Sequence, residues 1–109
     1  MKAMPNPESS DINDYISPGK IFMFSKMGCP YCVTAKSILK KLNVPFEVLD
    51  QDVTPPPPSI LKEAEKLSGM KTVPKIFVGT KLVGGCSDLE AKLKDGRLKE
   101  LFQSEGFKI

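Results

Sequence analysis

The sequence predicts a single-domain protein of the α/β class. The chain has 109 residues, 40% of them hydrophobic, which is enough for one core of two or three layers. A strand, a helix and a second strand are predicted in succession over about residues 20–50. Further along, two short apolar runs separated by Gly79-Thr80 have the pattern of an antiparallel hairpin. We therefore expect one domain over residues 1–109.

Proline and glycine delimit the first elements. Residues 1–9 include Pro5 and Pro7 among polar residues and are expected to form a flexible leader. A short helix within residues 10–17 should follow, ended by Pro18-Gly19. Residues 20–25 then have the apolar content of a buried strand.

The next helix is expected over residues 30–42, because Pro30 is tolerated in a first helical turn. Asn43 is a suitable stop, and residues 46–50 form the second strand. Strands joined through a helix in this way pair in parallel with a right-handed connection. The expected apolar face of this helix comprises Val33, Ala35, Ile38, Leu39 and Leu42.

Four consecutive prolines, residues 55–58, open the second half of the chain. Such a run is excluded from helices and from interior strands, so we interpret it as a stiff, polyproline-like spacer. A ligand for a proline-binding domain is the alternative interpretation. An amphipathic helix over residues 59–67 should follow the prolines.

The rest of the chain predicts the hairpin and two helices. The hairpin strands are residues 75–78 and 81–83, and Gly84-Gly85 closes the sheet. Ser87 and Glu90 have the spacing of a capping box, which predicts a helix running to about residue 93. Leu98, Leu101 and Phe102 indicate a last amphipathic helix.

Composition excludes several classes of function. The net charge of +3, from 16 basic and 13 acidic residues, is too small and too dispersed for nucleic-acid binding. We expect no membrane segment, and residues 1–11 lack a targeting pattern, so the predicted location is the cytoplasm. In a reducing compartment, a close pair among the three cysteines is catalytic or metal-binding rather than a permanent bridge.

The stretch Cys29-Pro30-Tyr31-Cys32 is such a pair, at the start of the predicted helix at residues 30–42. Residues three apart in a first helical turn share a face, and the unpaired N–H groups there favour a thiolate at Cys29. Lys26 lies just before the turn and can stabilise that thiolate, although most such lysines are simply solvated. Cys32 lies deeper in the helix, so its pKa should be higher. The pattern predicts that Cys29 attacks and Cys32 resolves.

Three separated motifs together resemble a family. The segment from Ser25 to Cys32, the triplet Thr72-Val73-Pro74, and Gly84-Gly85-Cys86-Ser87-Asp88 are similar to those of dithiol glutaredoxins. The resemblance covers about residues 20–102. It implies a thioredoxin-like fold, with a four-stranded mixed sheet flanked by helices, and one glutaredoxin domain.

The resemblance also implies the reaction. A member of this family is a glutathione-dependent thiol-disulfide oxidoreductase that acts on glutathionylated and disulfide-bonded proteins. Glutathione is the electron donor, and the glutathione reductase system regenerates it. We expect a monomer with no metal; the alternative is a dimer that binds a [2Fe-2S] cluster through Cys29 and glutathione, although Pro30 is unlike the small residue typical of cluster-binding members.

The glutathione site is implied residue by residue. Pro74 resembles a cis proline that leaves the Val73 backbone free to pair with the cysteinyl part of glutathione. The helix start at residues 86–88 would take the γ-glutamyl carboxylate, and Asp88 its amino group; a tight turn capped by Ser87 is a simpler interpretation compatible with this one. Cys86 is expected to be small and partly buried rather than catalytic. The expected glutathione-binding residues are Lys26, Tyr31, Thr72, Val73, Pro74, Gly85, Cys86, Ser87 and Asp88.

The chain departs from the family at a few of these positions. Ser87 stands where Asp is common, and Leu61 where a Gln often contacts the glycyl end of glutathione. Lys62 or Lys75 could supply the missing polar contact, or both could be ordinary surface lysines. Glutathione affinity is therefore expected to be weaker or differently distributed.

Overall fold

The computed structural model describes residues 8–108, and its centre is a four-stranded sheet. The strands are β1 (Ile21–Ser25), β2 (Glu47–Asp50), β3 (Lys75–Val78) and β4 (Lys81–Gly84). Their order across the sheet is β2-β1-β3-β4. β1 is parallel to β2 and antiparallel to β3, which in turn pairs with β4 as a hairpin. The predicted mixed sheet is confirmed.

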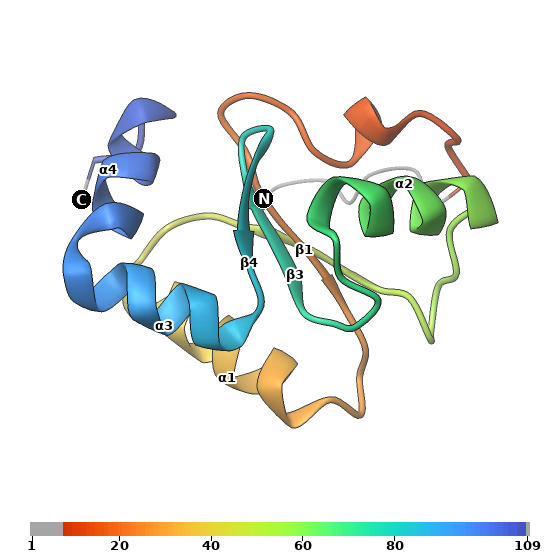
Figure 1. Ribbon diagram of the computed structural model, residues 1–109, viewed down its shortest axis with the longest axis horizontal. Helices are drawn as coiled ribbons and strands as arrows, with labels where there is room; N and C mark the ends of the chain where they lie inside the picture. Colours follow the sequence, from red (N-terminus) through yellow and green to blue (C-terminus); the bar gives the residue numbers. More distant parts are fainter. Residues whose placement is uncertain (1–7, 109) are drawn as a thin grey trace.

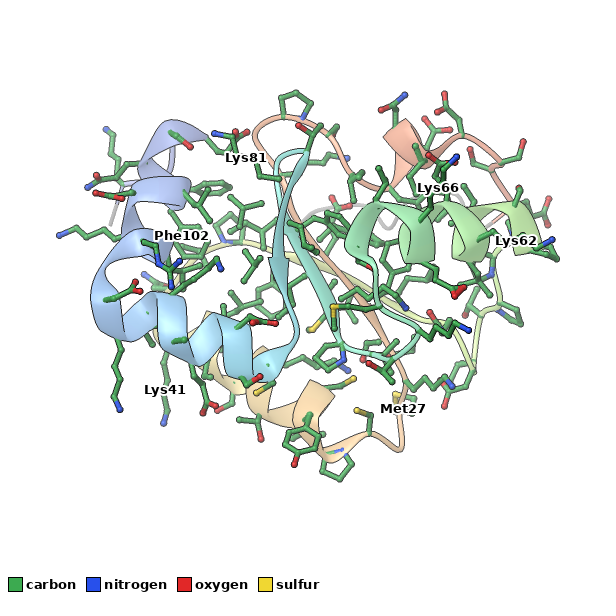
Figure 2. All side chains as sticks on the ribbon, in the orientation of Figure 1. Met27, Lys41, Lys62, Lys66, Lys81 and Phe102 are labelled. Atoms are coloured by element: carbon green, nitrogen blue, oxygen red, sulfur yellow. The ribbon has the colours of Figure 1, made fainter. Side chains whose placement is uncertain are left out.

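Helices cover both faces of the sheet (Figure 1). α1 (Pro30–Lys41), α3 (Cys86–Asp95) and α4 (Arg97–Ser104) pack on one face, where their side chains join those of Met23 and Ile76 in a single apolar cluster. α2 (Pro58–Ser68) and the short 3-10 helix η1 (Ile12–Asp14) cover the other face. Phe102 extends from α4 into the apolar cluster that contains Met23 and Ile76 (Figure 2).

Aromatic rings fill the face beneath α2. Tyr15, Phe22, Phe24 and Phe77 are each at most 1% exposed, and their ring centroids lie 4.9–6.2 Å apart. Edge-on and offset ring contacts of this kind add to the free energy gained by burial. Because alternate residues of a strand point to opposite faces, β1 contributes Phe22 and Phe24 to this cluster and Met23 to the other.

The structure describes only the end of the expected leader, and it corrects the helix expected after it. Most of the expected leader, residues 1–7, lies outside the described residues, but Ser9 is held by hydrogen bonds: its carbonyl accepts from the Tyr15 hydroxyl at 2.7 Å and its hydroxyl from the Asp11 N–H at 3.2 Å. The helix expected within residues 10–17 is only the single turn η1, capped by the Asp11 carboxylate.

The predicted helices are present, with three corrections. Pro58 begins α2, because a first helical residue needs no N–H donor. Val33, expected on the apolar face of α1, is 58% exposed, and Cys32 is buried instead. α3 starts at Cys86, with Gly85 as N-cap, so the capping box predicted from Ser87 and Glu90 is wrong.

Asn43 ends α1 as predicted, in the left-handed region at φ 58°. No helix within residues 8–108 is long and apolar enough to cross a membrane.

Candidate active site

The first turn of α1 holds the Cys29 sulfur against backbone N–H groups. β1 ends at Ser25, and a short turn brings Cys29 to the N-cap position, where its backbone is extended. Its sulfur accepts a hydrogen bond from the Cys32 N–H at 3.3 Å. Pro30 follows as the first helical residue, so no donor is lost there. The sulfur thus lies where the unpaired N–H groups and the helix dipole stabilise negative charge.

The surroundings of the two thiols shift their pKa values in opposite directions. Burial opposes ionisation of Cys29, but hydrogen bonds from the Cys32 thiol and from the N–H groups of Cys32 and Tyr31, with the charge of Lys26, bring its pKa below the ordinary cysteine value. Burial and a hydrogen bond to Cys29 raise the pKa of Cys32, which is fully buried. The electrostatic order predicted from the sequence is confirmed, with Cys29 the thiol that ionises first.

The loop before β3 faces this sulfur. The Cys29 thiol lies 3.8 Å from the Val73 carbonyl oxygen, to which it donates. The Val73-Pro74 peptide bond is cis, as the resemblance implied. An ordinary trans proline, which sequence statistics favour, is therefore excluded at this position.

The end of the hairpin brings α3 to the same place. Gly84 has φ +117°, and a Cβ there would come within 2.4 Å of the Asp88 carboxylate, so only glycine fits. That carboxylate accepts the Gly85 N–H at 3.0 Å. Asp88 thereby caps α3 and leaves the N–H groups at the start of the helix facing the loop.

Together these segments enclose a cleft of about 260 Å³ beside the dithiol. It contains eight of the nine residues expected to bind glutathione; the ninth, Lys26, lies outside its lining. Cys86 is 5% exposed, and burial raises the pKa of its thiol, which fits the expected non-catalytic role. The lining residues are Tyr31, Met70, Thr72, Val73, Pro74, Gly85, Cys86, Ser87 and Asp88.

Two residues near the dithiol were not identified from the sequence. Met70 lines the cleft, and its methyl group lies 3.3 Å from where a Cβ on Gly85 would be. The Asp52 carboxylate accepts the Met27 N–H at 3.1 and 3.2 Å and so anchors the turn before Cys29. Met70 lies just ahead of the Thr72-Val73-Pro74 motif, which was a usable signal; nothing in the local pattern pointed to Asp52.

Lys62 and Lys75, which were considered as extra polar contacts for glutathione, differ in their exposure to solvent. Lys62 is exposed on the outer side of α2 (Figure 2). Lys75, the first residue of β3, is only 4% exposed, so its description as a surface lysine is wrong. Because alternate residues of a strand point to the same face, Lys75 lies on the face of β3 that carries Phe77.

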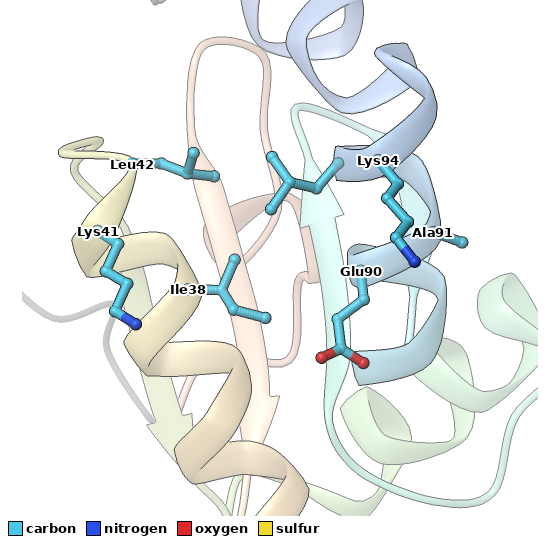
Figure 3. A pocket seen from close by; sticks show the side chains of 7 residues that line it. Ile38, Lys41, Leu42, Glu90, Ala91 and Lys94 are labelled. Carbon is cyan, nitrogen blue, oxygen red and sulfur yellow. The ribbon is translucent and has the colours of Figure 1, made fainter.

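A larger cleft, of about 650 Å³, lies between α1 and α3 (Figure 3). Ile38 and Leu42 extend from α1 toward α3, with Lys41, Glu90 and Lys94 at its edges. Its lining includes no cysteine and none of the residues expected to bind glutathione. Within residues 8–108, no group of three or more His, Cys, Asp or Glu is arranged to hold a metal ion.

The lowered pKa of Cys29 has a measurable consequence. Alkylation of Cys29 by iodoacetamide should follow a titration curve with its midpoint below about 8.5, the value of a free thiol, because thiolate persists to lower pH. Lys26→Met should move the midpoint upward only slightly, since hydrogen bonds contribute more than the lysine charge. Both cysteines lie on the peptide between Lys26 and Lys36, and fragmentation of that peptide by tandem mass spectrometry distinguishes Cys29 from Cys32. A midpoint at or above that of a free thiol would contradict this electrostatic assignment.

Comparison with known proteins agrees with this geometry. The glutaredoxin family model matches residues 21–83. The chain is 36% identical over 100 residues to glutaredoxin-1 of Sus scrofa, covering 87% of this chain and 92% of the pig protein, and 38% identical over 90 residues to glutaredoxin-1 of Homo sapiens, covering 80% and 85%.

Solved structures give the same result. The complex of buckwheat glutaredoxin with glutathione superposes with a TM-score of 0.72 at 29% identity, over 79% of this chain and 78% of that one. The dithiolic glutaredoxin 2-C-Grx1 of Trypanosoma brucei brucei superposes with a TM-score of 0.71 at 35% identity, over 93% and 99%. The fold is therefore thioredoxin-like. The chain belongs to the glutaredoxin family and is a glutathione-dependent thiol-disulfide oxidoreductase.

Proposed function

We propose that Cys29 is the nucleophile and that the protein reduces both glutathione mixed disulfides and protein disulfides. The observation that supports this best is the Cys29 sulfur, which accepts the Cys32 N–H at the start of α1 and has a lowered pKa. The Cys29 thiolate attacks the glutathione sulfur of a mixed disulfide. A Cys29–glutathione disulfide forms, and the target protein leaves as a thiolate that takes up a proton.

Two routes return the enzyme to its reduced state. A second glutathione thiolate attacks the glutathione sulfur of the Cys29 mixed disulfide, releasing oxidised glutathione and the Cys29 thiolate. With a protein disulfide, Cys29 instead becomes linked to the target, and Cys32 displaces it. The resulting Cys29–Cys32 disulfide is reduced by two glutathione molecules, and glutathione reductase recycles their oxidised product with NADPH.

Glutathione would lie in the 260 Å³ cleft. The Val73 backbone next to cis-Pro74 pairs with its cysteinyl residue, which brings the two sulfurs together. The N–H groups at the start of α3 bind the γ-glutamyl carboxylate, and Asp88 binds the amino group. The remaining lining residues, Tyr31, Thr72, Gly85, Cys86 and Ser87, complete the walls, and Lys26 acts from outside. The glutathione complex of the buckwheat relative supports this ligand.

The physiological setting proposed is a monomer in the cytoplasm, with glutathionylated or disulfide-bonded proteins as partners. Dispersed charge gives no reason to invoke nucleic acid.

The test is glutathione-dependent reduction of a small mixed disulfide, coupled to glutathione reductase and NADPH, with the visible spectrum recorded on the same preparation. Turnover by a colourless monomer is the expected result. An inactive protein that purifies brown as a dimer with glutathione would replace this proposal with binding of a [2Fe-2S] cluster.

A further inference from the structure

Exposed hydrophobic side chains are concentrated at the end of the molecule that carries the dithiol. Within residues 8–108, the four most exposed large hydrophobic residues are Met27, Tyr31, Val33 and Val53, each between 58% and 69% exposed. Tyr31 lines the glutathione cleft, whereas the other three lie outside its lining. Exposed apolar side chains that gather in one region mark a surface on which another molecule binds.

A hydrogen bond brings Met27 and Val53 close to each other. The Asp52 carboxylate accepts the Met27 N–H at 3.1 and 3.2 Å, so Val53, the next residue in the chain, lies beside the turn that precedes Cys29. Figure 2 shows Met27 near the start of α1. The loop after β2 and the turn after β1 therefore present their apolar side chains at the same place, although 26 residues separate them in the sequence.

Val33 faces the same loop from α1. Residues three apart on a helix share a side, so Val33 lies on the side that carries Lys36. Lys36 pairs with the Asp50 carboxylate at 3.2 Å, and the Asp50 carbonyl accepts the Val53 N–H at 3.0 Å. The charges of Lys36 and Asp50 compensate each other, which favours an apolar partner beside them. We refer to Met27, Val33 and Val53 as the apolar patch.

The position of Cys29 determines what covers this patch. Cys29 follows Met27 by two residues, and its thiol contacts the Val73 carbonyl in the wall of the cleft, so it lies between the patch and the cleft. Glutathione, a tripeptide, would occupy the cleft of about 260 Å³. A protein disulfide is larger. When Cys29 attacks it, one target sulfur becomes bonded to Cys29 and the other leaves as a thiolate that takes up a proton. The target chain beside the bonded cysteine must then lie against the surface around Cys29.

We propose that the apolar patch binds apolar side chains next to the reacting cysteine of a target protein, and that the enzyme thereby prefers disulfides with apolar neighbours. This inference rests on the proposed function and specifies its protein substrates. Burial of apolar surface in the complex supplies the preference. A small glutathione mixed disulfide lacks such neighbours, so its reduction does not depend on the patch.

The test uses two cyclic peptides, each with one internal disulfide, that carry either leucine or serine on both sides of each cysteine. Each kcat/KM from the coupled assay is divided by the rate constant of the uncatalysed reaction with glutathione, which removes differences in intrinsic reactivity. Wild type should prefer the leucine peptide by about tenfold, the effect of burying one or two apolar side chains. The double substitution Val33→Gln and Val53→Gln should remove this preference by lowering the value for the leucine peptide. Turnover of a small glutathione mixed disulfide should stay at the wild-type rate.

Two further variants make the result specific. The double substitution Val33→Leu and Val53→Leu keeps the patch apolar and should retain the preference. Leu93→Gln, which replaces an exposed leucine on α3 away from the patch, should behave as wild type. Thermal unfolding checks the fold, and the melting temperatures should stay close to that of wild type because all the altered side chains are exposed.

Three results would overturn the inference: equal use of the two peptides by wild type, an unchanged preference in the double glutamine variant, or an equal loss with the small mixed disulfide in that variant. Failure of wild type to reduce the small mixed disulfide would instead reject the proposed function.

Discussion

Cys29→Ser should abolish turnover of both glutathione mixed disulfides and protein disulfides, lowering kcat/KM by about a thousandfold or more. A serine hydroxyl stays protonated at neutral pH and cannot form a disulfide, so neither route can begin. The coupled assay with glutathione reductase measures the loss, with a protein-free blank to subtract the direct reaction of glutathione with the substrate.

The substitution should leave the fold intact, which makes the result interpretable. Cys29 is the N-cap of α1, where its sulfur accepts the Cys32 N–H. Serine is among the preferred N-cap residues and accepts the same hydrogen bond. The melting temperature should therefore stay close to that of wild type. Residual activity well above the blank in a properly folded Cys29→Ser protein would show that another group attacks the disulfide.

Much of the fold was predictable because its local patterns agree with its tertiary contacts. β1 is apolar up to its last residue, Ser25, as expected of a strand covered on both faces, and it lies between β2 and β3 in the sheet. Pro30 and Pro58 begin helices, and Gly69 and Gly96 follow the ends of helices, where their backbone preferences decide the boundary. The hydrophobic periodicity and the positions of glycine and proline thus predicted the same helices and strands independently.

The predictions failed where two local rules competed, or where a long-range contact decided the start of a helix or the burial of a side chain. Ser87 and Glu90 fit a capping box, but Asp88 reaches the Gly85 N–H because Gly84 leaves space for its carboxylate. Val33 was assigned to the apolar face of α1 because its side chain is apolar, but the buried residues Cys32, Ala35 and Leu39 define a helical face from which Val33 points away.

The candidate site also contains both residues that the sequence predicted and residues that it did not. The positions of both thiols, the cis proline and the lining of the cleft followed from motifs that recur as units. Lys75 did not, because its burial depends on α2 and on the pairing of β3 with β1, which lie far apart in the sequence. Asp52 was missed for the same reason, since its hydrogen bond to Met27 spans 25 residues.

Cys32→Ser should separate the two reactions. Reduction of a glutathione mixed disulfide should fall by no more than a few fold, because free glutathione resolves the Cys29 mixed disulfide without help. Reduction of a protein disulfide should fall by about a hundredfold or more. In wild type the Cys32 thiol is hydrogen-bonded to Cys29, so its effective concentration far exceeds that of millimolar glutathione.

The mechanism predicts a trapped species as well as a lost rate. Without its resolving thiol, Cys29 should accumulate as a mixed disulfide with the target protein, visible by non-reducing electrophoresis and identified by mass spectrometry. Cys32 is fully buried in the first turn of α1, and serine is smaller and polar, so a thermal unfolding curve must accompany the assay. Equal losses in both reactions from a protein that melts like wild type would show that Cys32 supports the Cys29 thiolate rather than resolving a bound target. The two reactions then distinguish a resolving thiol from one that only donates a hydrogen bond.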